Sequence, residues 1–132
     1  MKRILWTLFF ICLVVDIILA TFTWQEVRDI IGWVKNIPQK TDFKLRHFIQ
    51  YSPQAVLLGF CLEQFKFNLN KRALLSIIII TSIGCLTEFI QIFIPSRIPA
   101  LMDVFWNFSA AVFGSFIYYM IKKIYPRLKS KT

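Results

Sequence analysis

The sequence predicts an all-α membrane protein with about four transmembrane helices. Of its 132 residues, 57% are hydrophobic and only 17% are charged, whereas soluble domains contain about 45–50% apolar and about 25% charged residues. A single domain of this length cannot bury that apolar excess in its own core, because small domains leave much of their surface exposed. A lipid bilayer supplies the missing burial, so we expect one membrane domain over residues 1–132.

Four apolar stretches are long enough to cross a bilayer as helices. A transmembrane helix needs roughly 20 mostly apolar residues, and an open sheet would leave backbone groups unpaired in lipid. The stretches cover residues 4–22, 46–65, 73–94 and 102–125. The first follows two basic residues and is either a signal anchor or a cleaved signal peptide. Its length and the poor cleavage site at its end favour the anchor.

The longest stretch outside these spans, residues 23–45, has a helical pattern of its own. Trp24, Val27, Ile31 and Val34 recur at helical spacing, with charged residues between them. This pattern predicts an amphipathic interfacial helix between the first and second spans. The alternative is a partly ordered loop that touches the bundle.

Basic residues are distributed unevenly between the two sides of the predicted membrane domain. With four spans, both termini and the middle loop share one side, which holds ten Lys and Arg residues against six on the other. Because short cytoplasmic loops carry the excess of basic residues, both termini are expected in the cytoplasm. No soluble domain remains to bind nucleic acid, so the net charge of +9 indicates membrane lipids as partners. The oligomeric state is not predicted.

Polar residues gather at the outer ends of the spans. The second span contributes them from its first turn, the third from its last two turns and the fourth from its first turns, and the loop between the last two spans adds an arginine. Residues three or four apart share a helix face. We name the following set the polar cluster: Lys44, His47, Glu88, Gln91, Arg97, Asp103 and Asn107.

The polar cluster has two interpretations. A charged side chain at the centre of a span costs roughly 2.5–3.5 kcal/mol, and such groups usually face the bundle interior or a wet cavity. The carboxylates of Glu88 and Asp103 can be neutralised by the basic members of the cluster. The set is therefore either a structural ion-pair network or a polar cavity for a head group, a cation or a proton. A single histidine excludes a metal-binding histidine pair, so we expect neither a metal nor another cofactor.

Small residues at mid-depth predict how the helices pack. Gly59, Gly84 and Gly114 fall near the middle of the last three spans, and Ala110 stands four residues before Gly114. Small residues let membrane helices approach closely. We therefore expect a tight three-helix unit with the first span more peripheral.

The remaining polar and sulfur-containing residues are given structural roles. Asp16 is expected to be a hydrogen-bond partner in helix packing, and Glu63 is expected to pair with Lys66 at the inner interface. The three cysteines lie within spans without metal-ligand spacing, so they are expected to act as small apolar side chains.

Three motifs resemble those of the VanZ-like family of integral membrane proteins. The family pattern has Lys and His opening one helix, then E-x-x-Q with a following P-x-R, then D-x-x-x-N. The matching segments are Leu45-Arg46-His47-Phe48 with Tyr51, Glu88 to Arg97, and Asp103 to Asn107. The resemblance covers residues 44–119. The chain departs from the pattern at Phe43, where family members often have Asp, and at Ala110, where a glycine is usual.

The resemblance implies an integral protein of a bacterial cytoplasmic membrane with a role in the cell envelope. The family is named for low-level resistance to teicoplanin, a lipid-tailed glycopeptide. One hypothesis is a non-enzymatic protein whose outer polar pocket binds a lipid or cell-wall precursor head group. Another is a small transporter or proton-linked permease subunit in which Glu88 and Asp103 titrate. An envelope enzyme is less favoured, because no nucleophile elbow or phosphate loop identifies a reaction.

Overall fold

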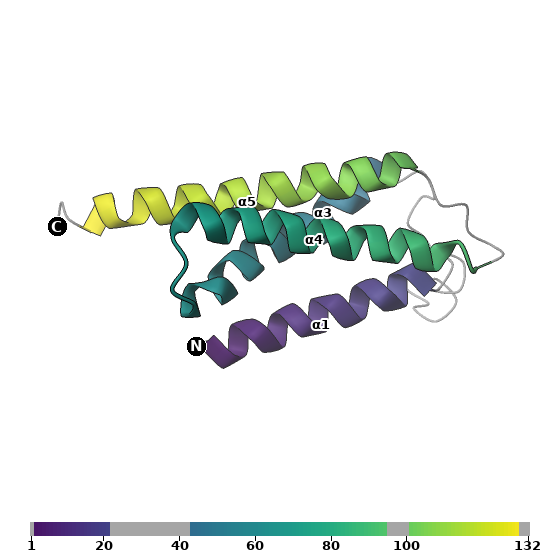
Figure 1. Cartoon of the computed structure of the whole chain (residues 1–132), viewed down its shortest axis with the longest axis horizontal. Coiled ribbons are helices and arrows are strands. Elements are labelled where there is room, and N and C mark those ends of the chain that lie inside the picture. Colours follow the sequence, from purple (N-terminus) through teal and green to yellow (C-terminus); the bar gives the residue numbers. More distant parts are fainter. Residues whose placement is uncertain (1, 22–42, 95–100, 130–132) are drawn as a thin grey trace, which may run out of the picture.

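The computed structural model describes residues 2–21, 43–94 and 101–129, which form helices and no strand. The elements are α1 (Lys2–Thr21), α3 (Phe43–Cys61), the 3₁₀ turn η2 (Leu62–Gln64), α4 (Leu69–Gln91) and α5 (Leu101–Lys129). Figure 1 shows the long helices lying lengthwise beside one another. The prediction of an all-α fold is confirmed. The predicted interfacial helix falls outside the described residues.

The helices coincide with the predicted apolar stretches but differ at their ends. Helix α4 begins at Leu69, four residues before the predicted stretch. The side chain of Asn68 accepts a hydrogen bond of 2.8 Å from the backbone N–H of Lys71 and so caps the helix. The first turn of α4 is therefore polar. The hydropathy pattern marks the apolar part of the helix and misses this capped polar turn.

Helices α3, α4 and α5 pack as one unit, and α1 lies against the side formed by α3 and α4. Helix α5 is the main packing partner of both α3 and α4. The buried core of the unit comes from all three helices. Its fully or almost fully buried apolar side chains include Tyr51, Ala55, Leu58, Ile80, Ala110, Ala111 and Tyr118.

Glycines lie where the helices of this unit come closest. A Cβ atom at Gly59 would lie 2.5 Å from the ring of Tyr118. At Gly114 it would meet the backbone carbonyl of Ser52 and lie 2.8 Å from the Cβ of Ala55. Real side chains do not tolerate such distances, so both positions require a residue without a Cβ. The close contact between α3 and α5 therefore depends on glycine at these two positions.

Serine hydroxyls add polar contacts between the same helices. Ser52 of α3 donates a hydrogen bond of 3.2 Å to the backbone carbonyl of Ala110 in α5. Ser76 of α4 donates one of 2.6 Å to the carbonyl of Ala55 in α3. Interhelical hydrogen bonds in membrane proteins contribute on average about 0.6 kcal/mol. These bonds therefore fix the register of the helices more than they determine the total stability.

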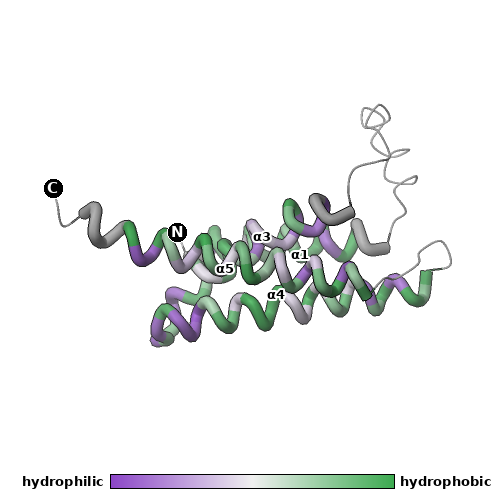
Figure 2. Tube along the Cα trace, turned by 90° about the horizontal axis from the view of Figure 1, so that it is seen from above, coloured by the Kyte–Doolittle hydropathy of each residue, from purple (hydrophilic) through white to green (hydrophobic). Residues whose placement is uncertain are grey.

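Apolar residues recur along α1, α4 and α5 (Figure 2), and many of their large apolar side chains are exposed. Within the described residues, Leu69–Gln91 and Leu101–Ile124 are long and apolar enough to cross a membrane, and only 28% and 33% of their apolar windows are buried inside the protein. A core helix of a soluble protein would be mostly buried. Large exposed side chains on α1 include Ile4, Leu8, Phe10, Ile11, Val14 and Val15. This surface is consistent with a membrane protein.

An ion pair joins η2, the 3₁₀ turn that follows α3, to α5 at the end opposite the polar cluster. The carboxylate of Glu63 lies 3.0 Å from the ammonium of Lys122 and accepts a hydrogen bond of 3.4 Å from the hydroxyl of Tyr118. The predicted partner, Lys66, is exposed. The prediction considered only residues close in sequence, and it was wrong because the packing of α5 along α3 brings Lys122 to the carboxylate.

The close α3–α5 contact makes the substitution Gly114→Ala destabilising. The added methyl group meets backbone atoms of Ser52, which cannot rotate away, so we expect the free energy of unfolding to fall by about 1–3 kcal/mol. Unfolding by sodium dodecyl sulfate in mixed micelles measures the change. Val112→Ala on the exposed face of the same helix is the control. Equal stability of Gly114→Ala and the wild type would contradict the contact.

Candidate functional site

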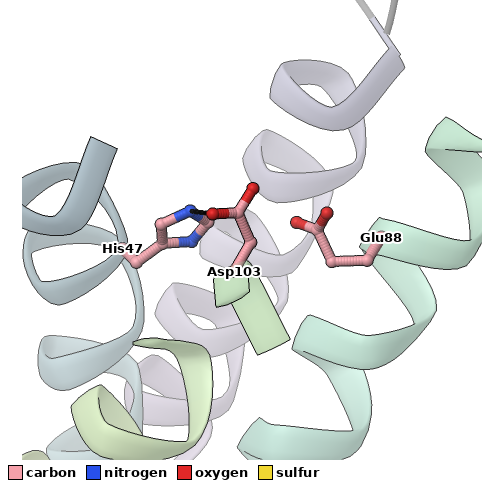
Figure 3. A group of neighbouring side chains, drawn as sticks. All are labelled: His47, Glu88 and Asp103. Carbon is pink, nitrogen blue, oxygen red and sulfur yellow. Dashed lines mark ion pairs between the residues drawn. The ribbon is translucent and has the colours of Figure 1, made fainter. Parts of the chain in front are cut away.

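Three ionisable side chains of the polar cluster meet where α3, α4 and α5 converge. His47 comes from α3, Glu88 from α4 and Asp103 from α5. One nitrogen or oxygen atom of each lies within 4.8 Å of the corresponding atoms of the other two. Figure 3 shows the carboxylate of Asp103 between the imidazole and the carboxylate of Glu88. Residues up to 56 positions apart in sequence therefore form one compact group.

The side chains of His47, Glu88 and Asp103 are largely shielded from solvent, and the ion pair between His47 and Asp103 is long. The Nε2 atom of His47 lies 3.5 Å from Oδ1 of Asp103, and these side chains are 3% and 17% exposed. Glu88 is 6% exposed. A distance of 3.5 Å fits an ion pair but exceeds the usual length of a hydrogen bond, about 2.7–3.2 Å. The nitrogen of His47 and the carboxylate oxygens of Glu88 and Asp103 therefore lie near one another, but the His47–Asp103 pair is too long for an ordinary hydrogen bond.

Two amide members of the polar cluster are buried in the adjoining turns. Asn107 is fully buried and Gln91 is 8% exposed. Asn107 lies beside the imidazole of His47, yet neither polar atom of its amide makes a hydrogen bond of good geometry within the described part of the chain. Gly84 makes room for it, because a Cβ there would lie 2.7 Å from its Nδ2 atom. A buried amide without such bonds costs about 1–3 kcal/mol and indicates a further polar partner.

The other two members of the predicted cluster are not placed by the structure. Lys44 belongs to the first turn of α3, but its side chain is outside the described set. Arg97 falls within residues 95–100, which are also outside it. Their participation remains a prediction.

Sequence reasoning left three neighbouring residues out of the cluster. Tyr51 stacks on His47 with ring centroids 6.3 Å apart and planes 8° from parallel, and its hydroxyl lies 2.8 Å from Oγ1 of Thr87. Thr87 donates to the carbonyl of Gly84, so Tyr51 is the donor of that bond. Arg46 is close enough for its charge to act on both His47 and Tyr51. The position of Tyr51 four residues after His47 was a signal that could have identified it.

A second polar contact joins α1 to α3 near the cluster. The two carboxylate oxygens of Asp16 accept hydrogen bonds from the side-chain amides of Gln50, at 2.9 Å, and Gln54, at 2.6 Å. Asp16 is 1% exposed. The structure thus gives Asp16 the hydrogen-bonding role expected from the sequence, with glutamines that the sequence reasoning did not single out. The charges of Asp16 and Glu88 both act on Tyr51, so the two polar regions adjoin.

The chemistry available at the group follows from its atoms. One imidazole and two carboxylates supply one nitrogen and up to four oxygen acceptors, so the group can bind a cation or exchange a proton. A surface groove of about 500 Å³ lies elsewhere, between α3 and α5 around Pro53 and Phe60, and no residue of the polar cluster lines it.

Substituting Asp16 tests the contact between α1 and α3. In Asp16→Leu the buried amide of Gln54 loses one of its two acceptors and keeps only the carbonyl of Gln50, so we expect the free energy of unfolding to fall by about 1–3 kcal/mol. Asp16→Asn is expected to lose less, because amide side chains can turn to offer either a donor or an acceptor. Titration with sodium dodecyl sulfate measures both, with Val15→Leu on the exposed face of α1 as control. Unchanged stability of both variants would show that the hydrogen bonds contribute nothing.

The comparison with protein families extends the resemblance seen in the motifs. The profile of the VanZ/LLP1 family matches residues 4–122, whereas the motifs cover only residues 44–119. Neither the comparison with curated proteins nor that with solved structures found a match. The match includes α1 and all three helices that carry the polar cluster, and it confirms the predicted family. The chain belongs to the VanZ/LLP1 family.

Proposed function

We propose that this chain is a multi-pass protein of a bacterial cytoplasmic membrane that binds the polar head group of a lipid or a lipid-linked cell-wall precursor. The polar cluster is the binding site, at the outer face. The observation that carries the proposal is the convergence of the buried His47 and Glu88 with the partly buried Asp103, from three different helices. Ionisable groups at such positions in membrane proteins usually serve function, because their burial in lipid is costly.

The apolar exterior supports the membrane location of the site. In this arrangement α1, α3, α4 and α5 all cross the bilayer, which agrees with their lengths of 19 to 29 residues and the roughly 20 residues needed to span it. The ends of α1 and α4 and the starts of α3 and α5 then share one side. The excess of basic residues on the opposite side supports the proposal that this side lies outside the cytoplasm.

The cellular role that fits such a site is low-level protection against teicoplanin-type glycopeptides. Teicoplanin is a lipid-tailed glycopeptide, and a lipid tail brings a molecule to the bilayer surface. A protein that binds lipid or cell-wall precursor head groups at that surface acts where the antibiotic accumulates. Vancomycin, which has no lipid tail, is the informative comparison.

Drug susceptibility tests the role of the polar cluster. A susceptible bacterium that expresses the wild-type chain is expected to tolerate more teicoplanin than the same host without it, with a smaller change for vancomycin. Glu88→Gln and Arg97→Ala are expected to remove the whole increase, because each removes a charge from the binding site. The minimum inhibitory concentration is measured together with the abundance of each variant in the membrane.

The control is Glu63→Gln, which removes a carboxylate from the opposite end of the bundle and is expected to retain the wild-type increase. If the cluster variants are as abundant as the wild type and protect equally well, the site is not used for this function. If they disappear from the membrane, the variants Asp103→Asn and Gln91→Met, which introduce no buried charge, are measured in the same way, and full protection by both counts against the proposal.

Cysteine labelling tests the orientation. The native residues Cys12, Cys61 and Cys85 are replaced by alanine, and Ser96→Cys places one thiol in the loop beside Arg97. A membrane-impermeant maleimide is expected to label this thiol in intact cells. Labelling only after lysis would place the polar cluster on the cytoplasmic side and invert the proposed topology.

A further inference from the structure

We propose that His47, Glu88 and Asp103 bind one divalent metal ion, of the Zn²⁺ or Mn²⁺ class, and that an anionic head group binds through this ion. The inference rests on the proposed function, because it names what the polar cluster binds first. It also departs from the expectation of no metal, which considered only histidine pairs. The ligand set here comes from three helices, and spacing in the sequence does not reveal it.

The geometry of the group is that of an open metal site. Each residue offers one ligand atom, and these atoms lie within 4.8 Å of one another. Zn²⁺ binds such nitrogen and oxygen atoms at about 2.0–2.2 Å, so ligand atoms around a tetrahedral ion stand roughly 3.4 Å apart. Side-chain rotation closes the difference. Glu88 has three rotatable bonds and Asp103 is partly exposed, so the ion can be bound without moving a helix.

The charge of the group favours a divalent cation over the head group alone. With a neutral imidazole, the carboxylates of Glu88 and Asp103 contribute a formal charge of −2, and Arg46 contributes a positive charge close enough to act on His47. Like charges in one buried site disfavour their joint ionisation, and they repel a phosphate. A divalent ion cancels the charge, and its remaining coordination positions are open to the oxygen atoms of an anionic head group. A bound divalent ion would therefore remove the electrostatic repulsion between the two carboxylates and an anionic head group.

Asn107 is the second observation that indicates a ligand. It is fully buried and within hydrogen-bonding reach of the His47 imidazole, and neither its amide oxygen nor its amide nitrogen makes a well-formed hydrogen bond within the described chain. The glycine at position 84 leaves it the space to reach this point. A metal site accounts for it, because the amide can bind the ion through its oxygen or orient water on the ion. Outer partners of this kind typically change metal affinity by about 10–100-fold.

The donor atoms select the class of metal. Imidazole nitrogen suits Zn²⁺ and other transition ions, whereas Mg²⁺ and Ca²⁺ prefer sites made only of oxygen. No cysteine belongs to the described group, so ions that require thiolate ligands are not favoured. Mixed nitrogen and oxygen ligands therefore indicate Zn²⁺ or Mn²⁺, with Mg²⁺ as the discriminating comparison.

Metal binding to the purified full-length chain tests the inference. The protein is prepared in detergent with an affinity tag that contains no histidine, treated with a chelator and dialysed against ZnCl₂, MnCl₂ or MgCl₂. We expect one equivalent of Zn²⁺ or Mn²⁺ per chain, weaker binding of Mg²⁺ and a rise in the unfolding temperature, since an ion that bridges three helices stabilises the folded state by mass action. Bound Mn²⁺ should show coupling to a histidine nitrogen in its electron spin resonance spectrum.

Conservative variants locate the site. Glu88→Gln, Asp103→Asn and His47→Gln are each expected to lower the affinity at least about 10-fold and to remove the metal-dependent rise in unfolding temperature. Asn107→Ala is expected to weaken binding to a lesser degree. Glu63→Gln is the matched control and is expected to bind like the wild type. Circular dichroism identifies the variants that remain folded. For any variant that does not fold, the substitute measurement is made on the wild type, where inorganic phosphate competes for the bound Mn²⁺.

The outcomes separate this inference from the proposed function. No stoichiometric metal binding by the wild type, or binding that Glu63→Gln alone removes, overturns the metal site. If protection against teicoplanin is still lost in Glu88→Gln, the proposed function stands without it. If metal binds at the cluster and protection is unaffected by Glu88→Gln, the proposed function fails and the metal site stands. Vesicles with and without an anionic lipid, compared with free phosphate, show which source of phosphate binds to the metal-loaded chain.

Discussion

The contact between Gly114 and the backbone of Ser52 is the constraint on which the rest of the bundle depends. The backbones of α3 and α5 approach closely here because Gly114 has no Cβ, and a Cβ at this position would overlap the carbonyl of Ser52. This contact fixes how α5 lies along α3. At one end it brings Lys122 to Glu63, and at the other it brings Asp103 to His47. Both ion pairs follow from one place of close approach between the same two helices.

The same principle operates between α4 and α5, where it has a chemical result. Gly84 gives space to a polar side chain, Asn107, instead of to a backbone. A larger residue at position 84 would push the amide away from His47. Gly84 therefore affects both the packing of α4 against α5 and the position of the Asn107 amide. The glycine that lets the helices approach also determines which polar atoms face the group formed by His47, Glu88 and Asp103.

Composition and apolar run length were sufficient to predict the helical class and the approximate helix ranges, because the length of an apolar run is set by the thickness of the bilayer. They also predicted that Glu88 and Asp103 lie at one level, since depth along a span can be counted in residues. What could not be predicted was lateral position. Depth alone does not say that Glu63 faces Lys122, or that Asp16 faces Gln50 and Gln54. Rotation of each helix about its axis depends on side-chain packing across the bundle, which a single sequence does not encode in any local pattern.

The contact between Asp16 and the two glutamines has a consequence for biogenesis. In the proposed four-span arrangement, Asp16 is synthesised 34 and 38 residues before its partners, so α1 would enter the membrane while its carboxyl group has no amide to bind. Each apolar residue around Asp16 contributes about −0.3 to −0.6 kcal/mol to the free energy of membrane insertion. These contributions allow α1 to insert before the carboxyl group of Asp16 has a hydrogen-bond partner. The docking of α1 must then wait for α3. The bundle is therefore completed by the helix that is synthesised first, and a chain arrested before Gln54 would hold an inserted but undocked α1.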